Sequence, residues 1–218
     1  MVRARNRQDI PVSGPDVPTS DRFPSTQRRV TRLESVIRRR QPSLTVVLED
    51  VYDPHNASAV LRTCDAVGVL DVHLVYVNQD VPRESFGRTA SASAAKWLNV
   101  HYHDSIESCY NLLKSQGFRI LATSLQEESR ELYDEDLAAP TALVFGNEKD
   151  GVSTEGIASA DGSIYIPMQG MVESLNISVS CAVTLYEAMR QRRARGMYES
   201  PQMDEASADA LLADWVSR

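Results

Sequence analysis

From Leu44 onward, short apolar runs alternate with amphipathic segments, and this alternation constrains the fold more than any other feature of the chain. The apolar runs are rich in β-branched residues and bounded by polar or glycine-containing stretches, as buried strands are. The predicted strands are 44–48, 72–77, 98–102, 118–122, 142–145 and 164–166, and the predicted helices are 56–67, 90–96 and 106–116. Strands separated by helices favour right-handed crossovers. We therefore expect an α/β fold with a mostly parallel sheet and helices on both of its faces.

Charge is distributed unevenly along the 218 residues. Residues 1–40 hold ten Arg against four Asp or Glu, whereas the whole chain carries a net charge of −7. A basic arm on an acidic body predicts a polyanionic partner. We divide the chain into a disordered N-terminal extension rich in proline (1–24), an arginine-rich helix (25–42), a main domain (43–196) and a C-terminal helical tail (197–218).

The arginine-rich helix places apolar residues such as Leu33 and Ile37 on one face and arginines around the others. A solvated helix whose arginines cover apolar surface is an alternative reading. Because a guanidinium group can hold two phosphate oxygens at once, the arginines favour phosphate recognition. The predicted RNA-binding residues are Arg28, Arg29, Arg32, Arg38, Arg39 and Arg40.

The cysteines and histidines do not follow the spacing of a metal site. Cys64, Cys109 and Cys181 are an odd number in apolar contexts, which predicts reduced core residues of a cytoplasmic protein. The four histidines are scattered, so we expect no metal. We also expect no membrane partner, because no apolar run is long enough to cross a bilayer and no signal peptide is evident.

Polar clusters follow three of the predicted strands, and the carboxyl ends of parallel strands are where such folds bind ligands. The first cluster is 53–56 with Arg62 beyond it, and Asn56 is explained equally well as a helix cap. Arg62 stands in an otherwise apolar helix, so a partly buried guanidinium would pair with an acid or reach an anionic ligand. The second cluster, 145–151, is a loop with two glycines around Glu148.

The third cluster, 166–180, runs from a strand that Pro167 ends to the start of a long helix. Gly170 allows a close backbone approach to a ligand. Three polar residues, Ser174, Asn176 and Ser178, crowd the start of the helix, where free backbone N–H groups are also available. The helix itself is predicted from Val179, Ala182, Val183, Tyr186 and Met189, which recur at helical spacing. An ordinary helix cap would explain one of the three polar residues, but all three together favour a site.

In this order the three clusters resemble the motifs of the SpoU class of RNA 2′-O-ribose methyltransferases, which belong to the knotted SPOUT superfamily. The matching stretches are NASAVLRTCDAVGV, ALVFGNEKDGVS and IPMQGMVESLNISVS, and the similarity extends roughly from Arg28 to the C-terminus. Within the class the chain is most similar to the TrmH group, which methylates the guanosine at position eighteen of the tRNA D-loop. The stretches RRRQPSLT and GMYESP followed by LLADWV favour this group.

The resemblance implies a C-terminal trefoil knot in residues 43–196, a homodimer, and S-adenosylmethionine as the methyl donor. The knot loops begin near Thr123, Gly146 and Ile166 and form the cofactor site of the class. The cofactor-binding residues it implies are Thr123, Gly146, Ile166, Leu175, Met168 and Gly170. In the class the last knot helix packs across the twofold axis, so each active site is expected to draw residues from both chains.

The activity implied is transfer of a methyl group to the ribose 2′-hydroxyl of guanosine-18 in tRNA. The catalytic residues implied are Arg62, Asn56, Glu148, Ser174 and Asn176. Arg62 would take the hydroxyl proton with help from an RNA phosphate, or stay charged and stabilise the developing alkoxide. Asn56 and Glu148 would orient Arg62 and the ribose, and Ser174 and Asn176 would hold the RNA phosphate and the site geometry. Two alternatives remain: an enzyme of the same class acting on ribosomal RNA or another tRNA position, and a non-catalytic RNA-binding protein, which the intact residue set disfavours.

Overall fold

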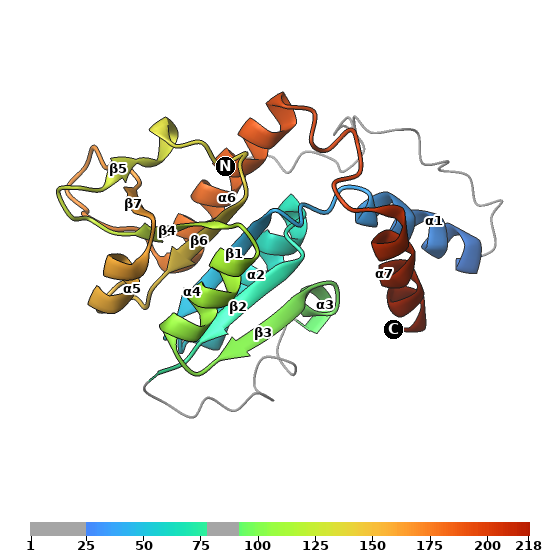
Figure 1. Cartoon of the computed structure of the whole chain (residues 1–218), viewed down its shortest axis with the longest axis horizontal. Helices are drawn as coiled ribbons and strands as arrows, with labels where there is room; N and C mark the ends of the chain where they lie inside the picture. The colour runs from blue at the N-terminus through green and yellow to red at the C-terminus, as the bar shows by residue number, and fades with distance from the viewer. Residues whose placement is uncertain (1–24, 78–91) are drawn as a thin grey trace, which may run out of the picture.

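The computed structural model describes residues 25–77 and 92–218 (Figure 1). The predicted disordered extension and the polar loop around Gly87 lie outside the described residues. No helix in the described ranges is long and apolar enough to cross a membrane.

The described strands form one seven-stranded sheet in the order β3-β2-β1-β6-β4-β7-β5. Every pairing between neighbouring strands is parallel, which confirms the predicted sheet. The strands are β1 Leu44–Glu49, β2 Asp71–Val75, β3 Asn99–His103, β4 Arg119–Thr123, β5 Arg130–Glu131, β6 Thr141–Phe145 and β7 Gly162–Tyr165. The two-residue strand β5 was not predicted, because so short a stretch carries no periodic pattern.

Helices cover both faces of this sheet, as expected (Figure 1). Residues of α2 and α6 share a hydrophobic core with one face, and residues of α4 and α5 share a second core with the other. The helices are α1 Ser25–Ile37, α2 Pro54–Val67, α3 Ala92–Ala95, α4 Ile106–Ser115, α5 Thr154–Ser159, α6 Ile177–Ala194 and α7 Glu205–Ser217, with a 3₁₀ turn at Leu132–Asp134.

The central strand β1 shows why the apolar runs fold in this way. All six of its residues are buried. Val46 and Leu48 enter the core beneath α2 and α6, whereas Val47 enters the core beneath α4. A strand buried on both faces must be apolar at nearly every position, which distinguishes it from the alternating pattern of a half-exposed strand.

The long helix α6 is fixed at its C-terminal end by a buried arginine. Arg192 is fully buried, and its guanidinium donates to the carbonyl oxygens of Leu137 at 3.0 Å, Ser43 at 2.9 Å and Ala139 at 3.0 Å. Burial lowers the pKa of Arg192 to about 10. Because these carbonyls precede β1 and β6, the contacts hold one end of α6 at the amino edge of the sheet. The N-terminal end of the helix consequently lies at the carboxyl edge.

The helix predicted from 179–189 is present as α6, and only some of the residues that predicted it face the core. Val179 and Tyr186 are 45% and 50% exposed, and the buried face begins instead at Ile177 and continues through Cys181 and Leu185. The apolar residues of α6 cover more than one face of the helix, so periodicity alone did not determine which face meets the core.

The predicted helical tail forms α7, which packs against α1. Trp215 of α7 is 1% exposed and belongs to a small hydrophobic cluster with Leu33, Ile37 and Leu70. This cluster fixes the position of α1 and thereby of the arginines on its surface. The division into domains and the trefoil knot stay predictions.

The assignment of Arg40 to RNA binding was wrong. Its side chain is fully buried, and its guanidinium lies 5.0 Å from the ring centre of Trp215. It donates to the carboxylate of Asp65 at 2.6 Å and to the carbonyl oxygens of Val69 at 2.8 Å and Trp97 at 3.0 Å. The chain leaves helix α1 before Arg40 and turns inward, so the side chain of Arg40 is buried. Its partners are internal, which makes Arg40 a structural residue.

Candidate active site

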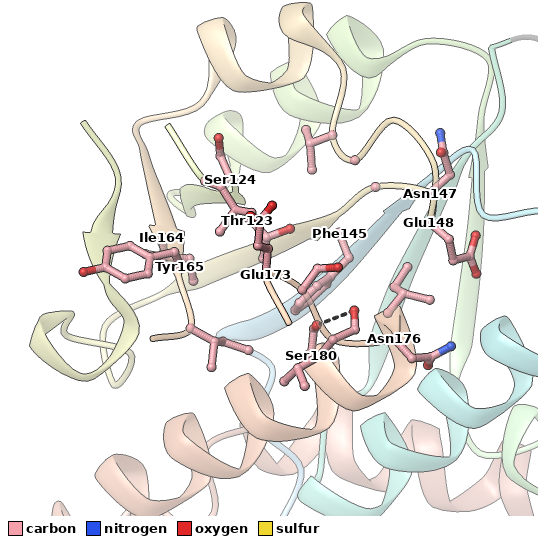
Figure 2. Close-up of a pocket in the computed structure, with 18 of the residues that line it drawn as sticks. Thr123, Ser124, Phe145, Asn147, Glu148, Ile164, Tyr165, Glu173, Asn176 and Ser180 are labelled. Carbon is pink, nitrogen blue, oxygen red and sulfur yellow. Dashed lines mark hydrogen bonds between the residues drawn. The ribbon is translucent and has the colours of Figure 1, made fainter. Parts of the chain in front are cut away.

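A cavity of about 630 Å³ opens at the carboxyl ends of three neighbouring strands, β4, β6 and β7 (Figure 2). Thr123, Phe145 and Ile164 come from these strands, and the start of α6 closes the remaining side. The cavity therefore lies where ligands bind in parallel sheets, as the polar clusters predicted.

Five of the six residues assigned to the cofactor line this cavity: Thr123, Gly146, Ile166, Met168 and Leu175. Gly170 is not among the lining residues. It stands in an exposed loop where an added Cβ would meet no atom within 4 Å, so the predicted close backbone approach is not found there.

Gly146 shows the close approach that was expected of Gly170. A Cβ on Gly146 would lie 1.9 Å from the carbonyl carbon and oxygen of Gly151 and 2.1 Å from the nitrogen of Val152. The loop folds back in this way because the side-chain oxygen of Asn147 accepts hydrogen bonds from the backbone of Lys149 at 2.9 Å and the residue after it at 2.8 Å. Gly151 completes the loop with a φ of +69°. No side chain larger than hydrogen fits at Gly146 without moving this loop.

The structure joins one residue from each of the three motifs into a hydrogen-bonded chain. The side-chain amide of Asn56 donates to the carboxylate of Glu148, and its oxygen accepts from the amide of Asn176 at 3.2 Å. Glu148 and Asn176 lie together at one end of the cavity, with Tyr165 at the other end (Figure 2). Residues separated by about a hundred positions in sequence thus meet at one point.

Two helix caps explain how Asn56 and Asn176 are positioned. Asn176 caps α6, because its oxygen accepts from the backbone nitrogen of Ser178 at 2.9 Å. Asn56 is not a cap, contrary to the alternative reading of the sequence; Asp53 caps α2 through the backbone nitrogen of His55. The side chain of Asn56 is therefore available for Glu148 and Asn176. Ser174 lines the cavity just before this cap.

Arg62 does not line the cavity of its own chain. Its side chain is exposed, so the expected partial burial was wrong, and it makes no hydrogen bond or ion pair within the described ranges. The buried face of α2 is formed by Val60, Leu61 and Cys64 among others. Asn56 does not line the cavity either, but it is hydrogen-bonded to Glu148 and Asn176, which do. Arg62 lies six positions later, about 9 Å further along the helix and roughly 120° around it, so the two side chains point in different directions.

Several charged residues at the cavity were not singled out from the sequence. Lys149, Asp150 and Glu173 line it beside the motif residues. Each stands next to a predicted site residue in the chain, so adjacency to the motifs was the only signal that could have identified them.

The donor set and the size of the cavity fit S-adenosylmethionine. A volume of about 630 Å³ falls within the range of sites for ligands of this size. Apolar side chains of Ile164, Ile166 and Leu175 offer a wall for a planar base, and Glu173 offers a negative charge for a cationic ligand. The close fold of the loop at Gly146 brings backbone polar groups to the same wall.

The remaining arginines assigned to RNA lie on or near α1. Arg28, Arg29, Arg32 and Arg38 are exposed, and Arg39 is half-buried. These residues form the basic surface that α7 holds in place.

Comparisons with known proteins identify the family to which the chain belongs. The family model described as "SpoU rRNA Methylase family" matches residues 43–186. The chain is 49% identical over 193 residues to a tRNA (guanosine(18)-2′-O)-methyltransferase of Thermus thermophilus, covering 88% of this chain and 98% of that protein.

Solved structures with a similar fold include the following two. The A. aeolicus TrmH/SpoU tRNA modifying enzyme has a TM-score of 0.79 and 38% identity, covering 88% of this chain and 96% of that one. The AdoMet-bound rRNA methyltransferase from Sinorhizobium meliloti has a TM-score of 0.59 and 26% identity, covering 72% of this chain and 59% of that one.

Proposed function

Because the chain belongs to the SpoU rRNA Methylase family, we propose that it transfers a methyl group from S-adenosylmethionine to the ribose 2′-hydroxyl of guanosine-18 in the tRNA D-loop. The observation that carries the proposal is the hydrogen-bonded chain of Glu148, Asn56 and Asn176 at the mouth of a cavity that fits the methyl donor. The choice of tRNA guanosine-18 rests on the relative from Thermus thermophilus, which is similar over nearly its whole length.

S-adenosylmethionine supplies an electrophilic methyl group on a positively charged sulfur. We assign its binding to Thr123, Gly146, Ile166, Leu175 and Met168, which line the cavity. These residues hold the donor in one orientation, and orientation of two reacting groups accounts for much of the rate in a transfer of this kind.

Asn56 fixes the site geometry, because an amide donates at one end and accepts at the other. It donates to Glu148 and accepts from Asn176, so it sets the orientation of both residues toward the incoming ribose. Ser174 and Asn176 contact the RNA phosphate next to that ribose. Arg62 either removes the hydroxyl proton with help from an RNA phosphate or, as a guanidinium, stabilises the alkoxide while that phosphate takes the proton.

We also propose that the enzyme is a homodimer in which Arg62 acts at the site of the partner. Two observations support this arrangement. Arg62 is exposed and stands outside the cavity of its own chain. In addition, α6 carries a second apolar surface in which Val179 is 45% and Tyr186 50% exposed, and Met171 in the loop before this helix is 99% exposed. Burying that surface against a twofold-related copy would bring a second chain to the mouth of the cavity.

Complementation between inactive variants tests the shared site. Arg62→Ala and Asn176→Ala are each expected to be inactive. If Arg62 and Asn176 of one site come from different chains, a mixed dimer has one intact site, so co-expression restores about a quarter of wild-type activity for random pairing in a twofold dimer. Co-expression without recovery, in a sample in which two different affinity tags have selected the mixed dimers, would place both residues in one chain.

The basic surface on α1 would hold the tRNA backbone through Arg28, Arg29, Arg32, Arg38 and Arg39. Phosphate contacts of this kind make binding steeply dependent on salt concentration. Because tRNA and S-adenosylmethionine meet in the cytoplasm, we propose that compartment as the site of action.

A competition assay separates this activity from its alternative within the family. Labelled methyl groups are followed from S-adenosylmethionine into an unmodified tRNA transcript and into fragments of ribosomal RNA offered together. Incorporation into tRNA, mapped to position eighteen, supports the proposal. Incorporation into ribosomal RNA alone would favour the activity of the Sinorhizobium meliloti neighbour and contradict the tRNA assignment.

A further inference from the structure

Three histidines that the sequence spreads over 31 positions gather on one face of the sheet. The parallel register pairs His73 of β2 with His101 of β3, and Val75 with His103. Since side chains alternate along a strand, His73, His101 and His103 point to the same face. Their rings are stacked: the ring centre of His73 lies 4.8 Å from that of His101 and 5.1 Å from that of His103.

A buried cysteine from the helix above joins two of these histidines. Cys109 of α4 is fully buried. The nitrogen atoms of His73 and His103 and the sulfur of Cys109 all lie within 4.8 Å of one another. The Nδ1 atom of His73 and the Nε2 atom of His103 are 2.9 Å apart. Three ligating side chains therefore converge from three different elements of the fold, which the spacing in the sequence did not indicate.

The surroundings make this cluster receptive to a cation. The carboxylate of Glu49 lies near enough to Cys109 to interact with it electrostatically. Glu49 itself is buried, accepts a hydrogen bond from the backbone of Ser153 at 2.9 Å, and has no cationic partner among the residues that the structure describes.

We propose that His73, His103 and Cys109 form a binding site for Zn²⁺ in which the ion takes the place of the proton between the two imidazoles. Binding forms two nitrogen–zinc bonds and one sulfur–zinc bond. The proton between the two rings moves to the other nitrogen of the ring that carries it, so both imidazoles stay neutral, and the thiol proton of Cys109 leaves to water. Two imidazoles and one thiolate are ligands that Zn²⁺ accepts. Because His103 is half-exposed, water can reach the ion as its fourth ligand.

Only small movements are required to reach tetrahedral geometry. Bonds of about 2.0 Å to nitrogen and about 2.3 Å to sulfur separate tetrahedral ligand atoms by roughly 3.3 to 3.6 Å. The two imidazole nitrogens, 2.9 Å apart, would separate by a few tenths of an ångström. The sulfur, which lies within 4.8 Å of both nitrogens, would approach by about 1.3 Å at most through rotation of its side chain.

The site is separate from the methyl-transfer cavity. The cavity is lined by the ends of β4, β6 and β7 and by the start of α6, and none of the three ligands belongs to it. The ion would connect β2 and the edge strand β3 to α4, so its role is structural. The inference departs from the expectation of no metal that the sequence suggested, and it does not depend on the proposed methyl transfer.

Cobalt titration of the full-length protein, treated beforehand with a chelator, tests the proposal. Co²⁺ bound to a thiolate gives an intense near-ultraviolet absorption band, so we expect one equivalent to produce this band and Zn²⁺ to displace it. Cys109→Ser should abolish the band, and His103→Asn should weaken Co²⁺ binding by about tenfold or more. Cys64→Ser and His55→Asn are matched controls, which should bind as the wild type does. Zn²⁺ should also raise the melting temperature of the wild type.

Absence of a thiolate band in the wild type at micromolar Co²⁺ would overturn the proposal. So would loss of the band in Cys64→Ser, because Cys64 lies outside the cluster. If Cys109→Ser fails to fold, His103→Asn decides the question, since His103 is half-exposed and its replacement leaves no buried cavity. Unchanged Co²⁺ affinity in folded His103→Asn would rule out the site.

Discussion

Replacing Arg40 by alanine separates a structural arginine from the RNA-binding arginines beside it. The guanidinium of Arg40 is fully buried and donates to the Asp65 carboxylate and to the carbonyl oxygens of Val69 and Trp97. It also packs over Trp215, through which α7 is attached to α1. The change to alanine removes all of these contacts at once and leaves two carbonyl groups without their donor.

The expected cost follows from these partners. Breaking a buried ion pair by removing one partner costs about 3–5 kcal/mol. The side chain of Asp65 is 32% exposed, so water can replace part of its lost partner, and we expect a value near the lower limit, about 3 kcal/mol. For a chain of this size, 1 kcal/mol corresponds to about 2–4 °C in melting temperature, so Arg40→Ala should melt roughly 6–12 °C lower.

Thermal unfolding, measured beside tRNA binding at a fixed salt concentration, tests this reasoning. Arg38→Ala is the matched control, because Arg38 is exposed on the same turn of chain. It should change stability by less than about 0.5 kcal/mol and weaken tRNA binding. An Arg40→Ala protein that melts as the wild type does, but loses tRNA affinity to the same extent as Arg38→Ala, would refute the structural role of Arg40.

Three further changes have distinct expected outcomes. Gly146→Ala forces the loop away from position 146 and should weaken S-adenosylmethionine binding, measured by calorimetry, by at least about tenfold, or 1.4 kcal/mol. Gly170→Ala should bind S-adenosylmethionine with the affinity of the wild type. Equal affinities of the two variants would contradict the close backbone approach at Gly146. Asn56→Asp places a carboxylate against Glu148 and should lower the melting temperature, with recovery when Glu148→Gln is added; no recovery would mean that the two side chains do not interact. Hydrogen bonds from Arg190 hold the pKa of Glu187 below its usual value. The stabilising contribution of Glu187 is therefore complete above about pH 4.5 and is lost as the pH falls through the lowered pKa. Glu187→Gln should make the free energy of unfolding less dependent on pH in this acid range, and an unchanged dependence would exclude Glu187 as its source.

The sequence predicted the sheet and the edge of the sheet that carries the site. A strand that is apolar on both faces, such as β1, is typical of a buried parallel sheet. Parallel strands separated by helices have their carboxyl ends at the same edge of the sheet. The polar clusters after those strands therefore had to approach one another. Asn56, Glu148 and Asn176 meet as a consequence of topology that periodicity reveals.

Side-chain exposure was not predictable in the same way. Arg40 and Arg38 are two residues apart in one arginine run, and only the path of the chain after α1 makes one buried and the other exposed. Apolar residues surround much of α6, so their spacing predicted the helix but not which of them are buried, and Tyr186 is 50% exposed. The gathering of His73 and His103 depends on strand register, which residue spacing along one chain does not encode.

The most direct test of the proposed activity uses two tRNA transcripts that differ by one atom. One transcript is unmodified, and the other carries 2′-deoxyguanosine at position eighteen, which lacks the accepting hydroxyl. Labelled methyl from S-adenosylmethionine should enter the first transcript and not the second. Equal incorporation into both transcripts, or into neither, would contradict methylation of guanosine-18.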